Sequence, residues 1–174
     1  MPRIDQDTQT VSFKVIFCSP RAALLVANFK KVAAEQGFAE FPAGLPHQDL
    51  TFSLGEVRGM KTDFILHPAP EDPAARAALL SGVDVVVLIA DKTPSEIAGC
   101  LAYAKDLCDA LRAQRIEVPV VVQMHGNPEL PDRPILEHLN FERITTVAAD
   151  AKTGDGIMET VKAAAKAGLL AAKG

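Results

Sequence analysis

The sequence has only three cysteines, and its excess of charge is acidic. Cys18, Cys100 and Cys108 form no CxxC pair, and an odd number at these spacings offers no disulfide framework. The cysteine usage therefore favours a reducing compartment, and we expect a cytoplasmic protein. The formal net charge of −4 argues against a nucleic-acid partner, because neutralising phosphates requires clustered lysine and arginine.

Long apolar segments are also absent. No apolar run reaches the ~20 residues that a membrane-spanning helix needs, and the longest, residues 83–90 (VDVVVLIA), has the length of a strand. The N-terminal segment MPRIDQDTQT is polar and has no signal-peptide pattern. We expect residues 1–10 to be flexible and residues 11–174 to form a single domain.

Strand-like and helical patterns alternate along the chain. The strand-like runs are residues 11–18, 50–57, 62–67, 83–90, 118–124 and 144–149. The second and third runs are joined by a short glycine-containing turn, which predicts an antiparallel hairpin, whereas the helical patterns elsewhere predict parallel neighbours. The sequence thus predicts an α/β fold with a six-stranded, mostly parallel sheet, one antiparallel edge strand and helices on both faces.

Two of the predicted helices have recognisable starts. Ser19 can cap, and Pro20 can begin, a helix after the first strand. Its inward face is predicted to consist of Leu25, Phe29 and Val32. Residues 93–96 (TPSE) form a capping box before an amphipathic helix. Cys100 and Cys108 lie on the apolar side of that helix and are expected to be small buried hydrophobic residues.

The turn after the first strand has the outline of a phosphate-binding loop without its chemistry. A GxxxxGK[ST] loop works because its glycines let backbone N–H groups approach phosphate oxygens, its lysine neutralises charge and its hydroxyl holds magnesium. Leu24, Leu25 and Val26 stand at the positions of the last glycine, the lysine and the hydroxyl. Losing two or three charge-assisted hydrogen bonds costs on the order of 3–9 kcal/mol of binding free energy.

One segment resembles a known family. Residues 49–70, DLTFSLGEVRGMKTDFILHPAP, are similar to the matching part of the bacterial gliding-motility GTPases of the MglA type, which are Ras-like small GTPases. The turn GEVRG is the most specific part of the likeness. It extends to FKVIFCSP, ALLSGVDVVVLIAD, VPVVVQMHGNPELP and ADAKTGDGIMETVKA, and so covers nearly the whole chain past residue 10. The resemblance implies a Ras-like G-domain.

The family's functional positions are mostly changed here. The resemblance places the Pro-Gly-Gln turn of the second switch on residues 70–72, where two carboxylates would repel a triphosphate. The guanine-reading Asn-Lys-x-Asp motif falls on residues 125–129, which lack the lysine, and only the last base-contacting loop, residues 150–154, persists. The vestigial positions are Ser19, Leu24, Leu25, Val26, Glu71, Asp72, Glu129, Ala151 and Lys152. We therefore predict a pseudo-GTPase without catalytic residues, cofactor or metal.

A G-domain that cannot switch would present one fixed surface. We predict a protein-interaction scaffold or adaptor, and the resemblance implies a role in bacterial polarity or motility with a Roadblock-type protein or a related small GTPase as partner. The expected surface combines the edge strand and its turn with the former second switch, because an unpaired strand edge can pair with another chain. Its residues are Glu56, Arg58, Met60, Lys61, Glu71, Asp72 and Arg76.

Two alternatives stay open at this point. Nucleotide binding or slow GTP hydrolysis could survive in a divergent form, with Arg21 as the nearest substitute for the missing lysine. Unrelated chemistry could occupy the crevice, because four residues near predicted strand ends could bind zinc or pair a thiol with a base. These residues are Cys18, His67, Asp91 and His125. A receiver-type domain is disfavoured, because the first strand lacks the acidic pair and the phosphoacceptor.

Overall fold

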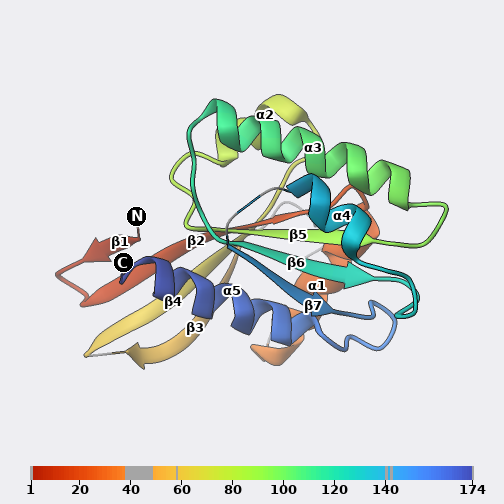
Figure 1. The fold of residues 1–174 in the computed structure, drawn as a ribbon. Coiled ribbons are helices and arrows are strands. Elements are labelled where there is room, and N and C mark those ends of the chain that lie inside the picture. The colour runs from red at the N-terminus through yellow and green to blue at the C-terminus, as the bar shows by residue number, and fades with distance from the viewer. Residues whose placement is uncertain (1, 38–48, 58, 140, 142, 174) are drawn as a thin grey trace.

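The computed structural model describes residues 2–37, 49–57, 59–139, 141 and 143–173, and these form a layered α/β structure (Figure 1). The strands are β1 (Arg3–Asp5), β2 (Thr10–Cys18), β3 (Leu50–Val57), β4 (Met60–Pro68), β5 (Val85–Asp91), β6 (Val120–His125) and β7 (Ile144–Ala148). The helices are α1 (Ala22–Glu35), α2 (Pro73–Leu79), α3 (Ile97–Ala113), α4 (Arg133–Leu139) and α5 (Ile157–Ala171). Across the described part of the chain, every helix is too short or too polar to cross a lipid bilayer.

A single sheet organises these elements. Its strand order is β3-β4-β2-β5-β6-β7, with β1 pairing to β2 beside this path. The β3–β4 pair and the short β1–β2 pair are antiparallel, and the other pairs are parallel. Because the parallel strands run in one direction, their carboxyl ends meet at one edge of the sheet. Ligands of open α/β sheets bind at this edge.

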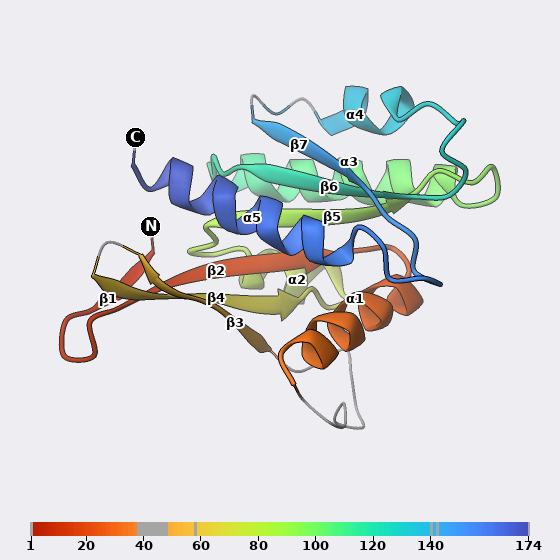
Figure 2. The same cartoon turned by 90° about the horizontal axis from the view of Figure 1, so that it is seen from below.

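Helices cover both faces of the sheet. Helices α1 and α5 lie on one face, and α2, α3 and α4 lie on the other (Figure 2). The alternation of side chains along β2 divides the core, since Phe13, Val15 and Phe17 pack with α1 and α5 whereas Ile16 and Cys18 pack with α3. Every residue of the central strand β5 is buried, which explains its unbroken apolar sequence. The α/β architecture predicted from the sequence is confirmed.

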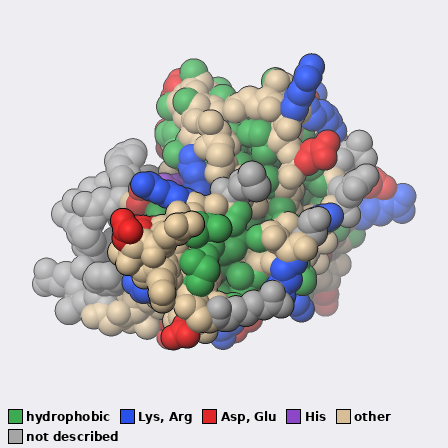
Figure 3. Space-filling model, turned by 90° about the vertical axis from the view of Figure 1, so that its left-hand side faces the viewer, with side chains coloured by type: hydrophobic (Ala, Val, Ile, Leu, Met, Phe, Trp, Pro, Cys, Tyr) green, Lys and Arg blue, Asp and Glu red, His purple; other side chains and the backbone are tan. Residues whose placement is uncertain are grey.

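The sheet has one strand more than the sequence indicated. All six predicted strands are present, and the predicted β3–β4 hairpin is antiparallel. The additional strand β1 lies in the first ten residues, which we expected to be flexible, and pairs with residues 10–12 of β2. Its three residues are all exposed, so the sequence has no alternation of apolar and polar residues that would predict this strand. At this end of the molecule, apolar side chains are exposed between acidic and basic ones (Figure 3).

The predicted capping box of α3 is wrong. The Thr93 hydroxyl donates to Oδ1 of Asp91 at 2.9 Å, and Glu96 occupies the N-cap position without a side-chain cap. Oδ1 of Asp91 also accepts from the Thr93 backbone N–H at 3.0 Å, so the carboxylate at the end of β5 fixes both the backbone and the hydroxyl of Thr93. The buried face of α3 nevertheless agrees with the prediction, because Cys100 and Cys108 are both buried free thiols.

Candidate functional site

The connection between β2 and α1 is the first part of the candidate site. Strand β2 ends at Cys18 and α1 begins at Ala22, with Arg21 at the N-cap position. The predicted capping role of Ser19 is wrong, because its hydroxyl oxygen accepts a hydrogen bond from the Arg21 backbone N–H at 3.1 Å, ahead of the helix. The connection is thus a tight turn followed directly by helix.

The positions assigned to the phosphate loop are already helical. The backbone N–H groups of Leu24 and Leu25 donate to the carbonyl oxygen of Arg21 at 3.1 and 3.4 Å. Their side chains are only 7% and 3% exposed and belong to the core between α1, α5 and the sheet, while Val26 is half-buried. The amides and the side chains at these positions are therefore engaged within the protein itself.

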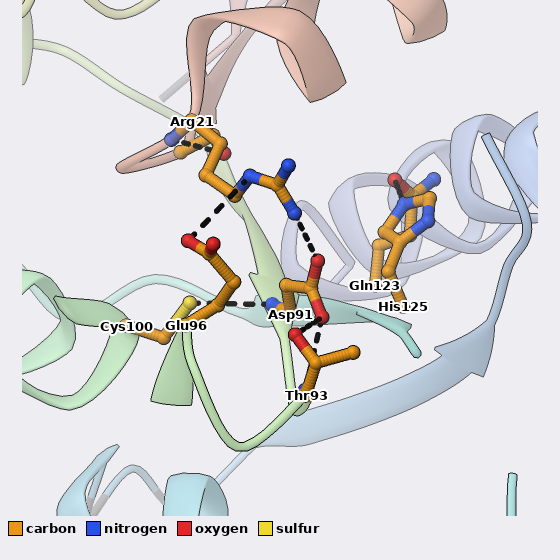
Figure 4. A network of polar contacts seen from close by, with 8 residues as sticks. Arg21, Asp91, Thr93, Glu96, Cys100, Gln123 and His125 are labelled. Carbon is orange, nitrogen blue, oxygen red and sulfur yellow. Dashed lines mark hydrogen bonds and ion pairs between the residues drawn. The ribbon is translucent and has the colours of Figure 1, made fainter. Parts of the chain in front are cut away.

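Polar residues from β5, the following loop and α1 meet at the carboxyl edge (Figure 4). The guanidinium of Arg21 contacts the Asp91 carboxylate through Nη1 and Oδ2, and its Nε lies 3.7 Å from Oε2 of Glu96. Oδ1 of Asp91 accepts hydrogen bonds from the backbone N–H and the hydroxyl of Thr93 at 3.0 and 2.9 Å. The Asp91 backbone N–H donates to Sγ of Cys100 at 3.2 Å. Arg21 is thus directed at two carboxylates of the protein.

The protonation of Asp91 follows from these contacts. Burial by itself raises the pKa of Asp91, but the hydrogen bonds from Thr93 and the charge of Arg21 outweigh it, and the pKa lies below its usual value. Asp91 is therefore ionised at neutral pH and forms a charged pair with Arg21. Arg21, the nearest substitute for the missing phosphate-loop lysine, thus has its charge balanced by a carboxylate of the protein itself.

A second polar network lies within the core, between β6, α1 and α5. Nε2 of Gln123 donates to Oδ1 of Asn28 at 2.9 Å and to Oγ1 of Thr160 at 2.8 Å, and Nδ2 of Asn28 donates back to Oε1 of Gln123 at 2.8 Å. Nε2 of His125 lies 2.8 Å from the same Oε1 (Figure 4). Gln123, Asn28 and Thr160 are fully buried. Sequence reasoning missed this network, although a glutamine within the apolar run VVVQMH is a signal of it.

His125 is a donor in this network. Because an amide oxygen can only accept, Nε2 of His125 carries the proton in its hydrogen bond to Gln123. Burial lowers the pKa of His125; the charges of Asp91 and Asp150 oppose this less strongly, and Arg21 adds a still smaller lowering effect. The ring is therefore neutral at neutral pH, and its position is structural support for the end of β6.

Within the described residues, the structure does not support the alternative of a zinc site or a thiol–base pair. Burial raises the pKa of the Cys18 thiol to about 12, so that thiol is protonated and unreactive. Nδ1 of His67 is 2.7 Å from Oδ1 of Asp49, away from the Asp91–Arg21 pair. Within the described residues, no group of three or more histidine, cysteine, aspartate or glutamate side chains is placed to hold a metal ion.

The loops after β6 and β7 enclose a cavity of about 410 Å³. It is lined by Lys92, Met124, Gly126, Pro128, Asp132, Ala148, Ala149, Asp150 and Asp155. The Lys92 ammonium donates to the Leu130 carbonyl and to Oδ1 of Asp132, each at 2.7 Å. Of the predicted vestigial positions here, Glu129 and Lys152 are exposed and Ala151 is half-buried. The Lys152 backbone N–H donates to Oδ1 of Asp150 at 2.7 Å, which closes the loop after β7.

The former second switch is the helix α2 and the turn before it. Asp72 is the N-cap residue of α2, and its Oδ2 accepts from the Ala75 backbone N–H at 2.7 Å. Arg76 was expected on the exposed surface, but it is only 4% exposed, and its guanidinium carbon lies 4.4 Å from the ring centroid of Tyr103 in α3. Its Nη1 also donates to the Glu71 carbonyl at 3.3 Å. Arg76 therefore attaches α2 to α3 and is not a surface residue.

The other predicted surface residues lie on the β3–β4 hairpin. Glu56 pairs with Lys61 across the hairpin, and Met60 is half-buried. Nζ of Lys61 is 3.2 Å from Oδ2 of Asp63. Arg58 lies outside the described residues. Among the described residues, β3 is the end strand of the sheet order, and Leu54 on it and Glu71 beside α2 are exposed.

The mostly parallel sheet with helices on both faces is consistent with a Ras-like G-domain. No protein-family model matches the chain. The chain is 30% identical, over an alignment 186 residues long including gaps, to the mutual gliding-motility protein MglA of Myxococcus xanthus (strain DK1622), and the alignment covers 95% of each chain. The chain belongs to the MglA family of bacterial Ras-like small GTPases. The family resemblance seen in the sequence is confirmed.

Proposed function

We propose that this chain is a pseudo-GTPase of the MglA family: a cytoplasmic protein that does not hydrolyse GTP and acts as an interaction scaffold or adaptor in bacterial polarity or motility. The observation that carries the proposal is the burial of Leu24 and Leu25 in the first turn of α1. The resemblance assigns these two positions to the glycine and the lysine of the phosphate loop.

Binding of a triphosphate at this turn would carry two independent energetic costs. A triphosphate could be cradled only if the first turn of α1 unwound and Leu25 left the core, and full burial of a leucine is worth about 1.5–3 kcal/mol. The reopened loop would still lack an ammonium group and a magnesium-binding hydroxyl, at a cost on the order of 3 kcal/mol or more. Each part alone reduces affinity by one to two orders of magnitude or more, at about 1.4 kcal/mol per factor of ten.

The charges at the crevice support the same proposal. Arg21 is the cation next to the turn, and it is paired with Asp91 and close to Glu96. An incoming phosphate would have to compete with both carboxylates for this guanidinium, and it would approach Glu71 and Asp72 on the neighbouring turn. Because like charges repel at short range, this part of the crevice disfavours an anion.

One observation favours a second candidate function, divergent guanine-nucleotide binding. The cavity of about 410 Å³ between the loops after β6 and β7 lies where the family's base-contacting loops are placed by the resemblance. A nucleobase could enter it without using the phosphate loop. Asp132, Asp150 and Asp155 line the cavity, so a neutral or donor-rich group suits it better than a phosphate.

The proposed interaction surface consists of the β3 edge, the β3–β4 hairpin and the turn before α2. Asp72 caps α2, and Arg76 holds it on Tyr103, so the surface has one fixed form and needs no nucleotide to set it. We propose a Roadblock-type protein or a related small GTPase as the partner. Strand addition at the β3 edge would give such a partner backbone hydrogen bonds and the exposed Leu54 as an apolar contact.

Thermal unfolding with nucleotides tests the loss of GTP binding. GTP, GDP and ATP are added with Mg²⁺ to the purified chain, and MglA serves as the positive control. We expect no shift of the melting temperature at millimolar GTP. A ligand at 100 times its Kd would add about 2.7 kcal/mol, or about 5–10 °C for a chain of this size. A guanine-specific shift of that order together with phosphate release would refute the pseudo-GTPase proposal.

Paired charge reversals test the surface. Glu56→Arg and Lys61→Glu are compared with the control Lys105→Glu on α3, where the side chain is also exposed. Association with a purified Roadblock-type protein or a second family member is measured by calorimetry. We expect the hairpin variants to weaken association and the control to leave it unchanged. Equal behaviour of all three variants would place the contact elsewhere.

A further inference from the structure

A groove of about 620 Å³ lies at the edge of the sheet opposite the carboxyl ends of the parallel strands. It is bordered by the end of α3, the start of β6 and the end of α5. Its lining combines three arginines with an apolar floor. The residues that matter here are Arg112, Arg115, Ile116, Val118, Phe141 and Arg143. We refer to these six residues as the arginine groove. It lies toward the side of the molecule shown in Figure 3.

Arginines outnumber acidic residues among the described residues that line this groove. Arg112 is 3.6 Å from Oδ1 of Asp109 through Nη1. Arg115 and Arg143 are exposed and form no ion pair with any residue that the structure describes. Glu117 is the one acidic residue among the described residues of the lining. In a chain with a net charge of −4, this local excess of guanidinium groups attracts an anionic occupant.

The backbone at Arg115 adds an independent observation. Its φ is +54°, a left-handed conformation in the position after the C-cap of α3, where glycine is usual. The Ile116 backbone N–H donates to the Leu111 carbonyl at 2.9 Å, which completes the helix-ending motif and turns Ile116 toward the core. Glycine would satisfy this turn with less strain. The residue at this position is instead an arginine, and it lines the groove.

We propose that the arginine groove binds an acidic peptide segment of a partner protein, with an apolar side chain of that segment seated on the floor. Guanidinium groups bind carboxylates through paired hydrogen bonds. Ile116, Val118 and Phe141 provide apolar surface for a leucine or a phenylalanine. A free phosphate would leave this floor uncovered, so the combination favours a peptide. This inference goes beyond the proposed function, because a chain that bound nucleotide at the other edge could use the same groove.

The test uses two labelled peptides and the full chain. One peptide is Glu-Glu-Leu-Glu-Phe-Glu-Glu, and the other has serine in place of leucine and phenylalanine. Binding is measured by fluorescence anisotropy. We expect the first peptide to bind at least about tenfold more tightly than the second, because fully burying one apolar side chain is worth about one factor of ten or more. Equal binding of the two peptides, or no binding of either, would refute the proposal.

Three variants locate the site. Arg143→Ser and Arg115→Gly should each weaken binding of the first peptide by about tenfold, through loss of charge-assisted hydrogen bonds. Lys30→Ser on the exposed side of α1 is the charge-matched control and should leave binding unchanged. Arg115→Gly should also raise the melting temperature by about 1–4 °C, since it removes backbone strain. Weaker binding in this variant therefore cannot be attributed to unfolding.

Two further outcomes count against the inference. If Arg143→Ser and Arg115→Gly bind the peptide as the unchanged chain does, the arginine groove is not its site. If the peptides do not bind but vesicles of phosphatidylserine sediment the chain in an arginine-dependent way, the groove serves a membrane surface. Nucleotide titrations on the same variants are read separately, so failure of this inference does not bear on the pseudo-GTPase proposal.

Discussion

Replacing Leu25 with lysine restores the phosphate-loop lysine at the position that the family resemblance assigns to it. If the space filled by the Leu25 side chain were open to solvent, a lysine there would be tolerated, and its ammonium group would favour GTP binding. In the structure the side chain of Leu25 is 3% exposed and packs with Phe29 and the β-strands. The substitution removes an apolar side chain worth about 1.5–3 kcal/mol and puts a cation into its place, which costs further desolvation.

We expect Leu25→Lys to lower the free energy of unfolding by about 3 kcal/mol or more, mostly through these two effects. For a chain of this size that corresponds to a fall of the melting temperature by about 6–12 °C. The matched control is Ala23→Lys, two residues earlier in the same helix, where the side chain is exposed and the change should stay within about 0.5 kcal/mol. Urea titration of both variants measures the difference.

The reasoning would be refuted by one combination of results. If Leu25→Lys were as stable as Ala23→Lys and bound GTP with Mg²⁺, the first turn of α1 would be an open phosphate loop that lacks only its cation. The pseudo-GTPase proposal would then reduce to a single missing side chain.

Three further substitutions test other parts of the site. Gly126 has a φ of +100°, and a Cβ there would lie 3.2 Å from Oδ1 of Asp91, so Gly126→Ala should cost more than about 1 kcal/mol; Gly99→Ala, inside α3 with open space around it, should be neutral or stabilising by urea unfolding. The pKa of Asp91 is lowered from 3.8 by its partners, so its stabilisation is fully present above that pH and is lost as the pH falls through the folded value; Asp91→Asn should flatten this acid limb of the stability curve, and an unchanged limb would contradict the pairing with Arg21. Arg76→Met should lower the free energy of unfolding by about 1–2 kcal/mol through loss of the contact with the Tyr103 ring, measured by calorimetry, and a neutral result would show that α2 is held by other contacts.

Because the chain belongs to the MglA family, these tests can be run in parallel on this chain and on a relative. The relative from Myxococcus xanthus aligns over 95% of both chains, so most positions have a counterpart with which they can be exchanged. Exchanging residues 24–26 in both directions, with GTP binding as the readout, tests whether that turn alone determines nucleotide affinity in the two proteins. The hairpin and the arginine groove can be exchanged in the same way, with association as the readout.

The order of the strands and helices, the hairpin and the family were determined by the sequence itself. Their signals are local: apolar alternation along β2, an unbroken apolar run in β5, the three- and four-residue spacing in α3 and glycine at the β3–β4 turn. Such patterns depend on the period of a strand or a helix and not on what packs against it. The likeness of residues 49–70 to the family is likewise a property of the chain.

The partners of polar side chains were decided only by the tertiary structure. Thr93 and Ser19 have the sequence context of helix caps. In the structure, however, the Thr93 hydroxyl donates to the Asp91 carboxylate, and the Ser19 hydroxyl accepts from the Arg21 backbone N–H. Arg76 has the appearance of a surface residue, yet packing of α2 against Tyr103 buries it. A polar group bonds to the best donor or acceptor within about 3 Å, and which group lies at that distance depends on strands and helices far apart in the sequence. The Gln123 network and the arginine groove are assembled across such elements for the same reason.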